Sequence, residues 1–263
     1  FIVLPLLPDR PVDPWGALNP RSLWMLVLLI STLSLVGYVA TRLLGAHRGI
    51  PLTGLTGGLV SSTAVTLAFA RQSRESAYAA AASALASGIV LAWAVMFLRV
   101  IVAVLVVNRA LLPSLAAPFG IMALVAIGFG WYLRVRAGRP GHAGGVPLRN
   151  PFSLRAAAKF AAFFALVLLI VKLVQAHAPG RGVYFIAALA GTTDVDAITL
   201  SMAQFAKAGE AQIAVNSITI AALTNTAVKA AMVGILGSRQ LRIPIMATAG
   251  AIIAAGVAAV SFA

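Results

Sequence analysis

Cysteine is absent from this chain, and acidic residues are scarce. The 263 residues contain 6 Asp plus Glu against 20 Lys plus Arg, and charged residues make up only 10% of the total. Without cysteine the chain forms no disulfide, no thiolate metal site and no thiol nucleophile. Soluble domains carry about 25% charged residues. The low charge therefore excludes an ordinary soluble enzyme and a disordered protein.

Enzyme signatures are also missing. The sequence holds no GxSxG, P-loop, HExxH or CxxC motif, and each of these patterns supports a known catalytic or ligand-binding geometry. An intramembrane aspartyl enzyme would use two acids, but the acids here lack a supporting signature. We therefore expect no enzyme, and no cofactor beyond a bound cation.

The composition is dominated by apolar residues, which make up 61% of the chain. They gather in eight runs that lack the period-2 alternation of a β-barrel, and each is close to the ~20 residues that a membrane helix needs. The runs lie near 22–42, 52–70, 77–107, 112–133, 156–176, 183–206, 212–236 and 243–262. The pattern predicts an all-α, polytopic transmembrane bundle. The basic residues lie mostly between the runs, as in membrane proteins, so we expect no nucleic-acid partner.

The apolar runs divide into two halves. Residues 1–21 have the pattern of the end of a preceding membrane helix and a loop, and residues 134–155 form a basic linker rich in Gly, Pro and Arg. The linker separates a first membrane repeat, 22–133, from a second, 156–262.

Residues 48–67 align with residues 181–200 at a constant offset of 133. Six of the twenty aligned positions are identical: Arg48 and Arg181, Gly49 and Gly182, Gly58 and Gly191, Ala64 and Ala197, Thr66 and Thr199, Leu67 and Leu200. If all four helices of each repeat cross the membrane, the repeats are parallel. If the second helix of each is re-entrant, the number of crossings is odd and the repeats are inverted. The sequence leaves both arrangements open.

The repeated segment is unusually polar for a membrane span, and the second helix of each repeat is predicted to be interrupted there. Interrupted segments at corresponding places in two halves are a sequence sign of a transport site. Asp194 and Asp196 are the two acids inside a predicted span, and hard cations prefer such oxygen ligands. The hydroxyl residues predicted to join them at an ion site are Ser61, Ser62, Thr63, Thr66, Thr193 and Thr199. Thr193 and Asp196 fit a capping box, with Thr193 as the N-cap, which is typical of a half-helix that begins inside the membrane. The alternative is a purely structural cap near the membrane interface.

Two basic residues complete the set. Arg99 and Lys229 each lie ten residues before a loop arginine, which is about 15 Å along a helix. We expect them to act as a gate or as counter-ions, or else to form structural ion pairs with the two aspartates. Asn225 precedes Lys229 by one turn and lines the ion path or bonds a neighbouring helix.

Small residues predict close helix packing. Gly54 and Gly58 form a GxxxG motif, which lets two helix backbones approach each other. We expect similar small-residue faces to support a homo-oligomer.

Three motifs resemble a known family: the segment around Arg21 to Trp24, residues 57–66 and residues 191–200. They resemble the uncharacterised C-terminal membrane domain that follows the MgtC-like domain in MgtC/SapB-type bacterial membrane proteins. The resemblance covers residues 18–262. It implies a multi-pass protein of the bacterial inner membrane, in a family associated with growth at low magnesium and with regulation of other membrane machinery.

Together these features predict a transporter or channel-like permease in the lipid bilayer. The expected substrate is a small ion, with a cation favoured, Mg²⁺ and proton-coupled transport among the candidates, and the Asp194–Asp196 pair as its metal site. The same basic residues would suit an anion. The alternative is a non-transporting regulatory or assembly module of the MgtC/SapB type.

Overall fold

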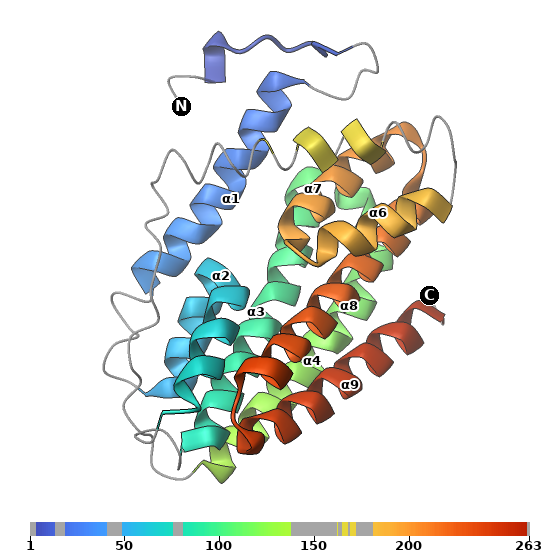
Figure 1. Cartoon of the computed structure of the whole chain (residues 1–263). Helices are drawn as coiled ribbons and strands as arrows, with labels where there is room; N and C mark the ends of the chain where they lie inside the picture. The colour runs from blue at the N-terminus through green and yellow to red at the C-terminus, as the bar shows by residue number, and fades with distance from the viewer. Residues whose placement is uncertain are drawn as a thin grey trace. The chain divides into compact units, whose positions relative to one another are not determined.

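The computed structural model describes residues 4–13, 19–40, 49–75, 81–137, 162, 165–167, 169–171 and 181–261. Within these residues the regular elements are all helices, which confirms the predicted all-α class. The longer helices are α1 (Pro20–Ala40), α2 (Ile50–Gln72), α3 (Ala82–Val107), α4 (Leu112–Arg136), α6 (Arg181–Gly191), α7 (Val195–Phe205), α8 (Ala211–Leu236) and α9 (Arg239–Ser261) (Figure 1). Three short 3₁₀ helices accompany them: η1 (Leu4–Leu6), η4 (Arg109–Leu111) and η5 (Ala206–Ala208).

Among the residues that the structure describes, five helical segments are long and apolar enough to cross a membrane, so the chain is a multi-pass membrane protein. They are Ile50–Gln72, Ala82–Val107, Arg109–Arg136, Ala211–Leu236 and Arg239–Ala259. Six predicted apolar runs correspond to α1, α2, α3, α4, α8 and α9. The run 183–206 forms two short helices, α6 and α7, instead of one. The run 156–176 and the linker 134–155 lie mostly outside the described residues.

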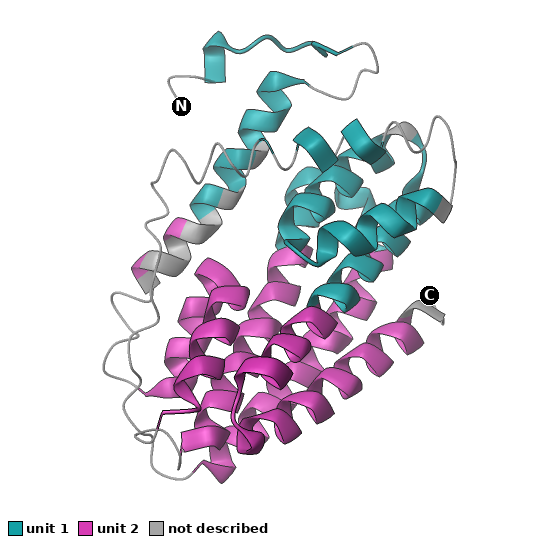
Figure 2. Cartoon of the chain, in the orientation of Figure 1, with its two compact units in different colours: residues 1–32, 102–113, 151–225 teal, residues 33–101, 114–150, 226–263 magenta. Residues whose placement is uncertain are grey.

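The chain forms two compact units (Figure 2). Unit 1 comprises Phe1–Thr32, Val102–Pro113 and Pro151–Asn225, and unit 2 comprises Leu33–Ile101, Ser114–Asn150 and Thr226–Ala263. Unit 1 therefore contains α6 and α7, whereas unit 2 contains α2 and α9. Helices α3 and α8 contribute residues to both units.

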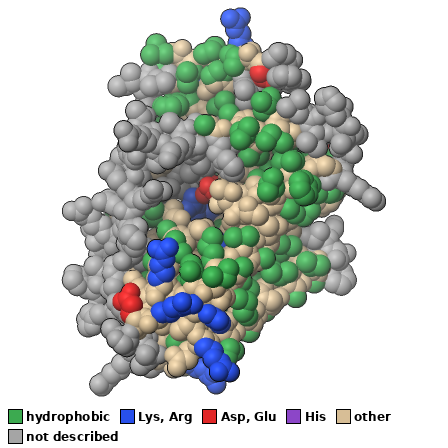
Figure 3. Space-filling model, in the orientation of Figure 1, with side chains coloured by type: hydrophobic (Ala, Val, Ile, Leu, Met, Phe, Trp, Pro, Cys, Tyr) green, Lys and Arg blue, Asp and Glu red, His purple; other side chains and the backbone are tan. Residues whose placement is uncertain are grey.

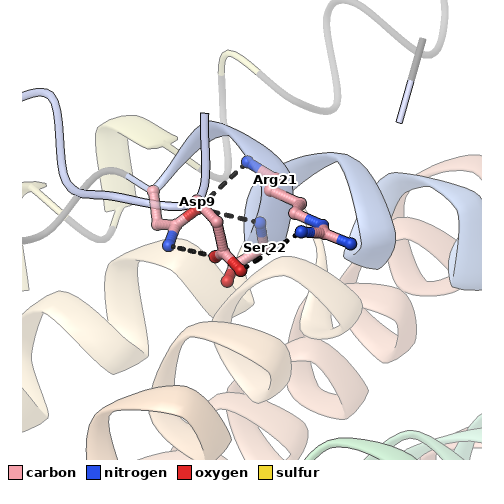
Figure 4. A network of polar contacts seen from close by, with 4 residues as sticks. Asp9, Arg21 and Ser22 are labelled. Carbon is pink, nitrogen blue, oxygen red and sulfur yellow. Dashed lines mark hydrogen bonds and ion pairs between the residues drawn. The ribbon is translucent and has the colours of Figure 1, made fainter. Parts of the chain in front are cut away.

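Helix α1 begins at a side-chain cap in unit 1. The side chain of Asn19 accepts hydrogen bonds from the backbone N–H groups of Arg21 (3.0 Å) and Ser22 (3.2 Å), and Pro20 occupies the first helical position, where its missing N–H costs nothing. Asp9 accepts a hydrogen bond from Asn19 and pairs with Arg21 at 3.4 Å (Figure 4). Because this ion pair is exposed, it contributes only about 0–1 kcal/mol.

Small residues allow close backbone contacts in unit 2, as the GxxxG motif predicts. The position that a Cβ on Gly54 would occupy coincides with the backbone of Gly88, and a Cβ on Gly58 would lie 2.6 Å from the Cα of Ala92. Large side chains fill the space beside these contacts. Trp93 is fully buried, as are Phe69, Phe97, Phe119 and Leu85.

The outer surface of the helices is apolar. Figure 3 shows hydrophobic side chains over much of the visible face. Large apolar residues are exposed on the helices, among them Leu105, Val106, Leu124, Ile127, Trp131, Phe185, Ile235 and Ile243. Such a surface is unfavourable in water and is typical of helices that face lipid.

We predict that Gly54→Ala destabilises the protein by about 2 kcal/mol or more, because a methyl group there forces α2 and α3 apart. Gly128→Ala is the matched control, since nothing lies within 4 Å of its Cβ position. In this control, higher helix propensity should leave stability unchanged or raise it by up to about 1 kcal/mol. Unfolding in detergent, followed by circular dichroism, compares the two variants. Equal stability of both would contradict the close packing.

Candidate functional site

Helix α2 is divided at Ser61, whose backbone is extended (φ −163°, ψ 108°). The break gives two halves, residues 50–60 and 62–72. The first half runs parallel to α3, since Gly54 lies against Gly88 and, four residues later on both helices, Gly58 lies against Ala92.

The second half of α2 runs back along the same part of α3. Thr66 accepts a hydrogen bond from the indole N–H of Trp93 (3.0 Å), and Phe69 reaches the Cβ position of Gly88 at 2.5 Å. A Cβ on Gly57 would lie 2.8 Å from the side chain of Val65, although eight residues span about 12 Å in a straight helix. Helix α2 is therefore a helical hairpin with its tip at Ser61, not a single straight span.

Unit 1 contains a second hairpin, made of α6 and α7. Helix α6 runs parallel to α8, because Asn216 donates to the hydroxyl of Tyr184 (3.2 Å) and Asn225 donates to the carbonyl of Gly191 (2.7 Å). Helix α7 then returns to the beginning of α8, since only η5 and two further residues connect Phe205 to Ala211. The tip of this hairpin comprises residues 192–194.

Both tips carry a side-chain cap for the returning helix. Ser61 Oγ accepts from the backbone N–H of Ala64 (3.2 Å), and Asp194 Oδ1 accepts from the backbone N–H of Asp196 (2.8 Å). Asp194 has an extended backbone like that of Ser61 (φ −155°, ψ 131°). The sequence-based assignment of Thr193 as the cap is wrong by one residue, because Asp194 has the extended backbone and its side chain accepts the N–H of Asp196.

The α2 tip exposes backbone carbonyls that the break leaves without helical partners. Arg99 of α3 donates to the carbonyls of Leu59 (2.8 Å) and Val60 (3.4 Å). Its side chain is only 8% exposed. Arg99 therefore replaces the missing helical donors at the tip, and burial argues against a side chain that extends to the membrane surface.

Lys229 of α8 reaches the same tip within unit 2. Its Nζ lies 2.7 Å from Ser62 Oγ and 2.8 Å from Met96 Sδ, and the residue is 1% exposed. Two cationic side chains thus converge on the α2 tip: Arg99 bonds the last residues of the first half, and Lys229 bonds the first residue of the returning half. Asp194 and Asp196 belong to unit 1, so their predicted pairing with Arg99 and Lys229 stays a prediction.

Comparison with known proteins identifies the family of this chain. The family model "Domain of unknown function (DUF4010)" matches residues 28–237. This chain belongs to the DUF4010 family. An uncharacterized protein of Aquifex aeolicus (strain VF5) is 32% identical over 198 residues, which are 73% of this chain and 84% of that protein. No solved structure matches the chain significantly. Neither match names MgtC/SapB proteins, so that resemblance stays a prediction.

In this DUF4010 chain the predicted site residues lie in two groups, one at each hairpin tip. The α2 tip in unit 2 brings together Ser61, Ser62, Arg99 and Lys229, with Thr66 one turn further on. The α6–α7 tip in unit 1 brings together Thr193, Asp194, Asp196 and Asn225, with Thr199 on the first turns of α7. Thr63 is half-buried, and Thr193 is exposed. No group of three His, Cys, Asp or Glu side chains suited to a metal occurs in the described part of the chain.

Several groups at these tips were not predicted from the sequence. Met96 and Trp93 contact site residues, but an apolar side chain on a membrane helix gives no sequence signal of such a role. The carbonyls of Leu59, Val60 and Gly191 were missed as well. Their role follows from the break at Ser61 and after Gly191, not from residue type.

We predict that Arg99→Met destabilises the protein by about 2 kcal/mol, because part-buried carbonyls at the α2 tip lose their donor. Arg109→Met serves as the matched control, since Arg109 is exposed and surface changes usually stay within about 0.5 kcal/mol. Detergent unfolding curves for the two variants provide the comparison. The assigned role of Arg99 fails if both variants unfold like the wild type.

Proposed function

We propose that this DUF4010 chain is a membrane transporter for a small ion, built from two inverted repeats with re-entrant hairpins. The α2 tip carries the proposal, because there a half-buried, irregular backbone lies between helices and is bonded by the buried side chain of Arg99. Non-helical backbone at membrane depth is tolerated only where it is buried in protein or lines an aqueous cavity. Broken helices that place ion sites at this depth are typical of secondary transporters.

The proposed repeats each contain one hairpin and three crossing helices. In the first, α1 precedes the α2 hairpin, and α3 and α4 follow it. In the second, the predicted span 156–176 precedes the α6–α7 hairpin, and α8 and α9 follow. An odd number of crossings makes the repeats inverted.

Two observations support equivalence of the repeats. The caps Ser61 and Asp194 stand at positions that the offset of 133 aligns, since 61 plus 133 is 194. The helix contacts also correspond. Gly58 lies against Ala92 on the helix after its hairpin, and the aligned Gly191 lies against Ala221 on the helix after its own.

Contacts between helix ends agree with this order of crossings. Within unit 2, Ser73 after α2 accepts from the backbone N–H of Ser238 after α8 (2.8 Å). Within unit 1, Asn108 after α3 donates to the carbonyl of Ala203 near the end of α7 (3.1 Å). If α2 and α6–α7 are re-entrant hairpins, the order of crossings places both members of each pair on the same side of the membrane. If α2 and α6–α7 instead span the membrane, Ser73 and Ser238 lie on opposite sides.

The length of the hairpins supports a site at mid-depth. Each half of α2, and each of α6 and α7, has 11 residues, or about 16 Å of helix. This is roughly half of the ~30 Å hydrocarbon core. At the α6–α7 tip, Asp194 and Asp196 provide carboxylate oxygens, which favour a cation.

We predict that cysteines at positions 75 and 210 react with a membrane-impermeant maleimide from opposite sides of the bilayer. Both Glu75 and Glu210 are exposed and flank the hairpins, and the natural chain has no cysteine to interfere. Glu75→Cys should therefore be labelled in right-side-out vesicles and Glu210→Cys in inverted ones, or the reverse. Labelling of both from one side would show that α2 and α6–α7 span the membrane and that the repeats are parallel.

We further predict that the protein conducts a cation into proteoliposomes and that Asp196→Asn reduces this flux at least about tenfold, because the site loses its charge. Glu210→Gln makes the same chemical change at an exposed position and should leave flux unchanged. Flux of Na⁺, K⁺, Mg²⁺, protons and chloride is measured for each protein. If none of these ions moves through the folded wild type, the transporter proposal fails in favour of a regulatory or assembly module.

A further inference from the structure

Two arginines of unit 2 meet at the end of α8. Arg74, which follows α2, donates to the carbonyls of Ile235 (2.7 Å) and Gly237 (3.4 Å). Arg242, in the first turn of α9, donates to the same carbonyl of Gly237 (3.1 Å). Because both side chains bond one oxygen atom, the two guanidinium groups lie within a few ångströms of each other. We call Arg74 and Arg242 the arginine pair.

The groups around the arginine pair do not balance its charge. The dipole of α8 places about half a negative charge at this helix end, against two full positive charges. Glu75 is exposed, and neither arginine of the pair forms an ion pair with a residue that the structure describes. Arg71 and Arg239, each three residues earlier in the chain, are exposed and add positive charge. Capping of α8 therefore explains the hydrogen bonds, but the excess positive charge favours an anion.

Exposed apolar side chains lie directly beside the arginine pair. Ile235, which provides one of the bonded carbonyls, is 71% exposed, and Ile243, the residue after Arg242, is 68% exposed. Met246 is 41% exposed and shares a face of α9 with Arg242, four residues earlier. A Cβ on Gly234 would lie 2.8 Å from the end of the Met246 side chain. Helices α8 and α9 therefore pack side by side here, and each presents apolar surface next to the basic groups.

This combination suits a phospholipid better than a soluble anion. Arginine binds phosphate oxygens through strong, paired N–H bonds, and basic residues near the end of a span interact with lipid headgroups. Exposed apolar side chains give a soluble anion no favourable contact, but they pack well against acyl chains. Along α9 the arginine comes first and the exposed apolar residues follow, which is the order of headgroup and chain in a lipid. Figure 3 shows basic and hydrophobic side chains next to one another at the lower end of the visible face.

We propose that Arg74 and Arg242 bind the phosphate of an anionic phospholipid whose acyl chains lie on Ile243 and Met246. The excess positive charge selects an anionic lipid, because the headgroup of a zwitterionic lipid brings its own ammonium group to the site. This lipid site uses the ends of α2 and α8 and the beginning of α9, not the hairpin tips. It is independent of the proposed transport function.

The test measures the melting temperature of the full, delipidated chain in detergent as phosphatidylglycerol is added. A ligand that binds only the folded state raises this temperature, and phosphatidylcholine with the same acyl chains should need an at least about fivefold higher concentration. Arg74→Gln and Arg242→Gln should each raise the half-maximal phosphatidylglycerol concentration about fivefold, the effect of one basic residue at an anionic lipid surface. Arg136→Gln removes the same charge from the exposed end of α4. It is the matched control and should keep the wild-type value.

Two further measurements separate a lost lipid contact from a lost helix cap. Each shift is taken from the melting temperature of the same variant without lipid. Ile243→Ser changes an exposed residue, so it should leave the lipid-free protein unchanged and still weaken the effect of phosphatidylglycerol.

Four outcomes would overturn the inference. The first is equal stabilisation by phosphatidylcholine and phosphatidylglycerol, and the second is equal weakening by Arg136→Gln and Arg74→Gln, which would indicate bulk charge alone. The third is stabilisation by glycerol 3-phosphate at the concentration at which phosphatidylglycerol acts, which would indicate a site for a soluble anion. The fourth is stabilisation by soluble polyglutamate but not by phosphatidylglycerol, which would indicate an acidic protein partner.

Discussion

Backbone polar groups must be satisfied inside the membrane, and the rest of this structure depends on that constraint. A hairpin tip in hydrocarbon leaves several N–H and C=O groups without helical partners, each costing several kcal/mol if unmet. The chain meets the cost with side chains from the following helix. Arg99 bonds two carbonyls at the α2 tip, and Asn225 bonds one at the α6–α7 tip. Ser61 and Asp194 satisfy N–H groups of the returning helices.

Donors of this kind reach the tips only because the helices approach closely. Gly58 and Gly191 have no side chain where Ala92 and Ala221 pass, and Gly54 similarly meets Gly88. A larger residue at any of these positions would separate the hairpin from the helix that supplies its donor. The small residues of the repeated segment therefore allow the close approach that its polar groups need in order to be hydrogen-bonded. This explains why the segment is poor in large apolar side chains although it lies within a membrane protein.

Much of this was predictable from sequence, but the direction of the returning helices was not. Apolar runs gave the helices, and the Gly, Ser and Thr residues around Ser61 gave the interruption. A kinked span and a hairpin have the same composition and the same local pattern. They differ in contacts such as Thr66 with Trp93, which join residues 27 positions apart. The cap was misassigned because Thr193 and Asp194 are both good capping residues, and only the extended backbone at Asp194 selects between them.

The two tips share a backbone design but differ in charge. At the α2 tip the cap is a neutral serine, and two cationic side chains, Arg99 and Lys229, bond the tip residues. At the α6–α7 tip the cap is an aspartate, a second aspartate follows it, and the bond from α8 comes from a neutral amide. A shared backbone arrangement does not imply a shared role, because the side chains at a site decide its chemistry. The cation site that we propose is therefore assigned to the acidic tip. At the α2 tip, Arg99 bonds backbone carbonyls and Lys229 bonds Ser62 Oγ.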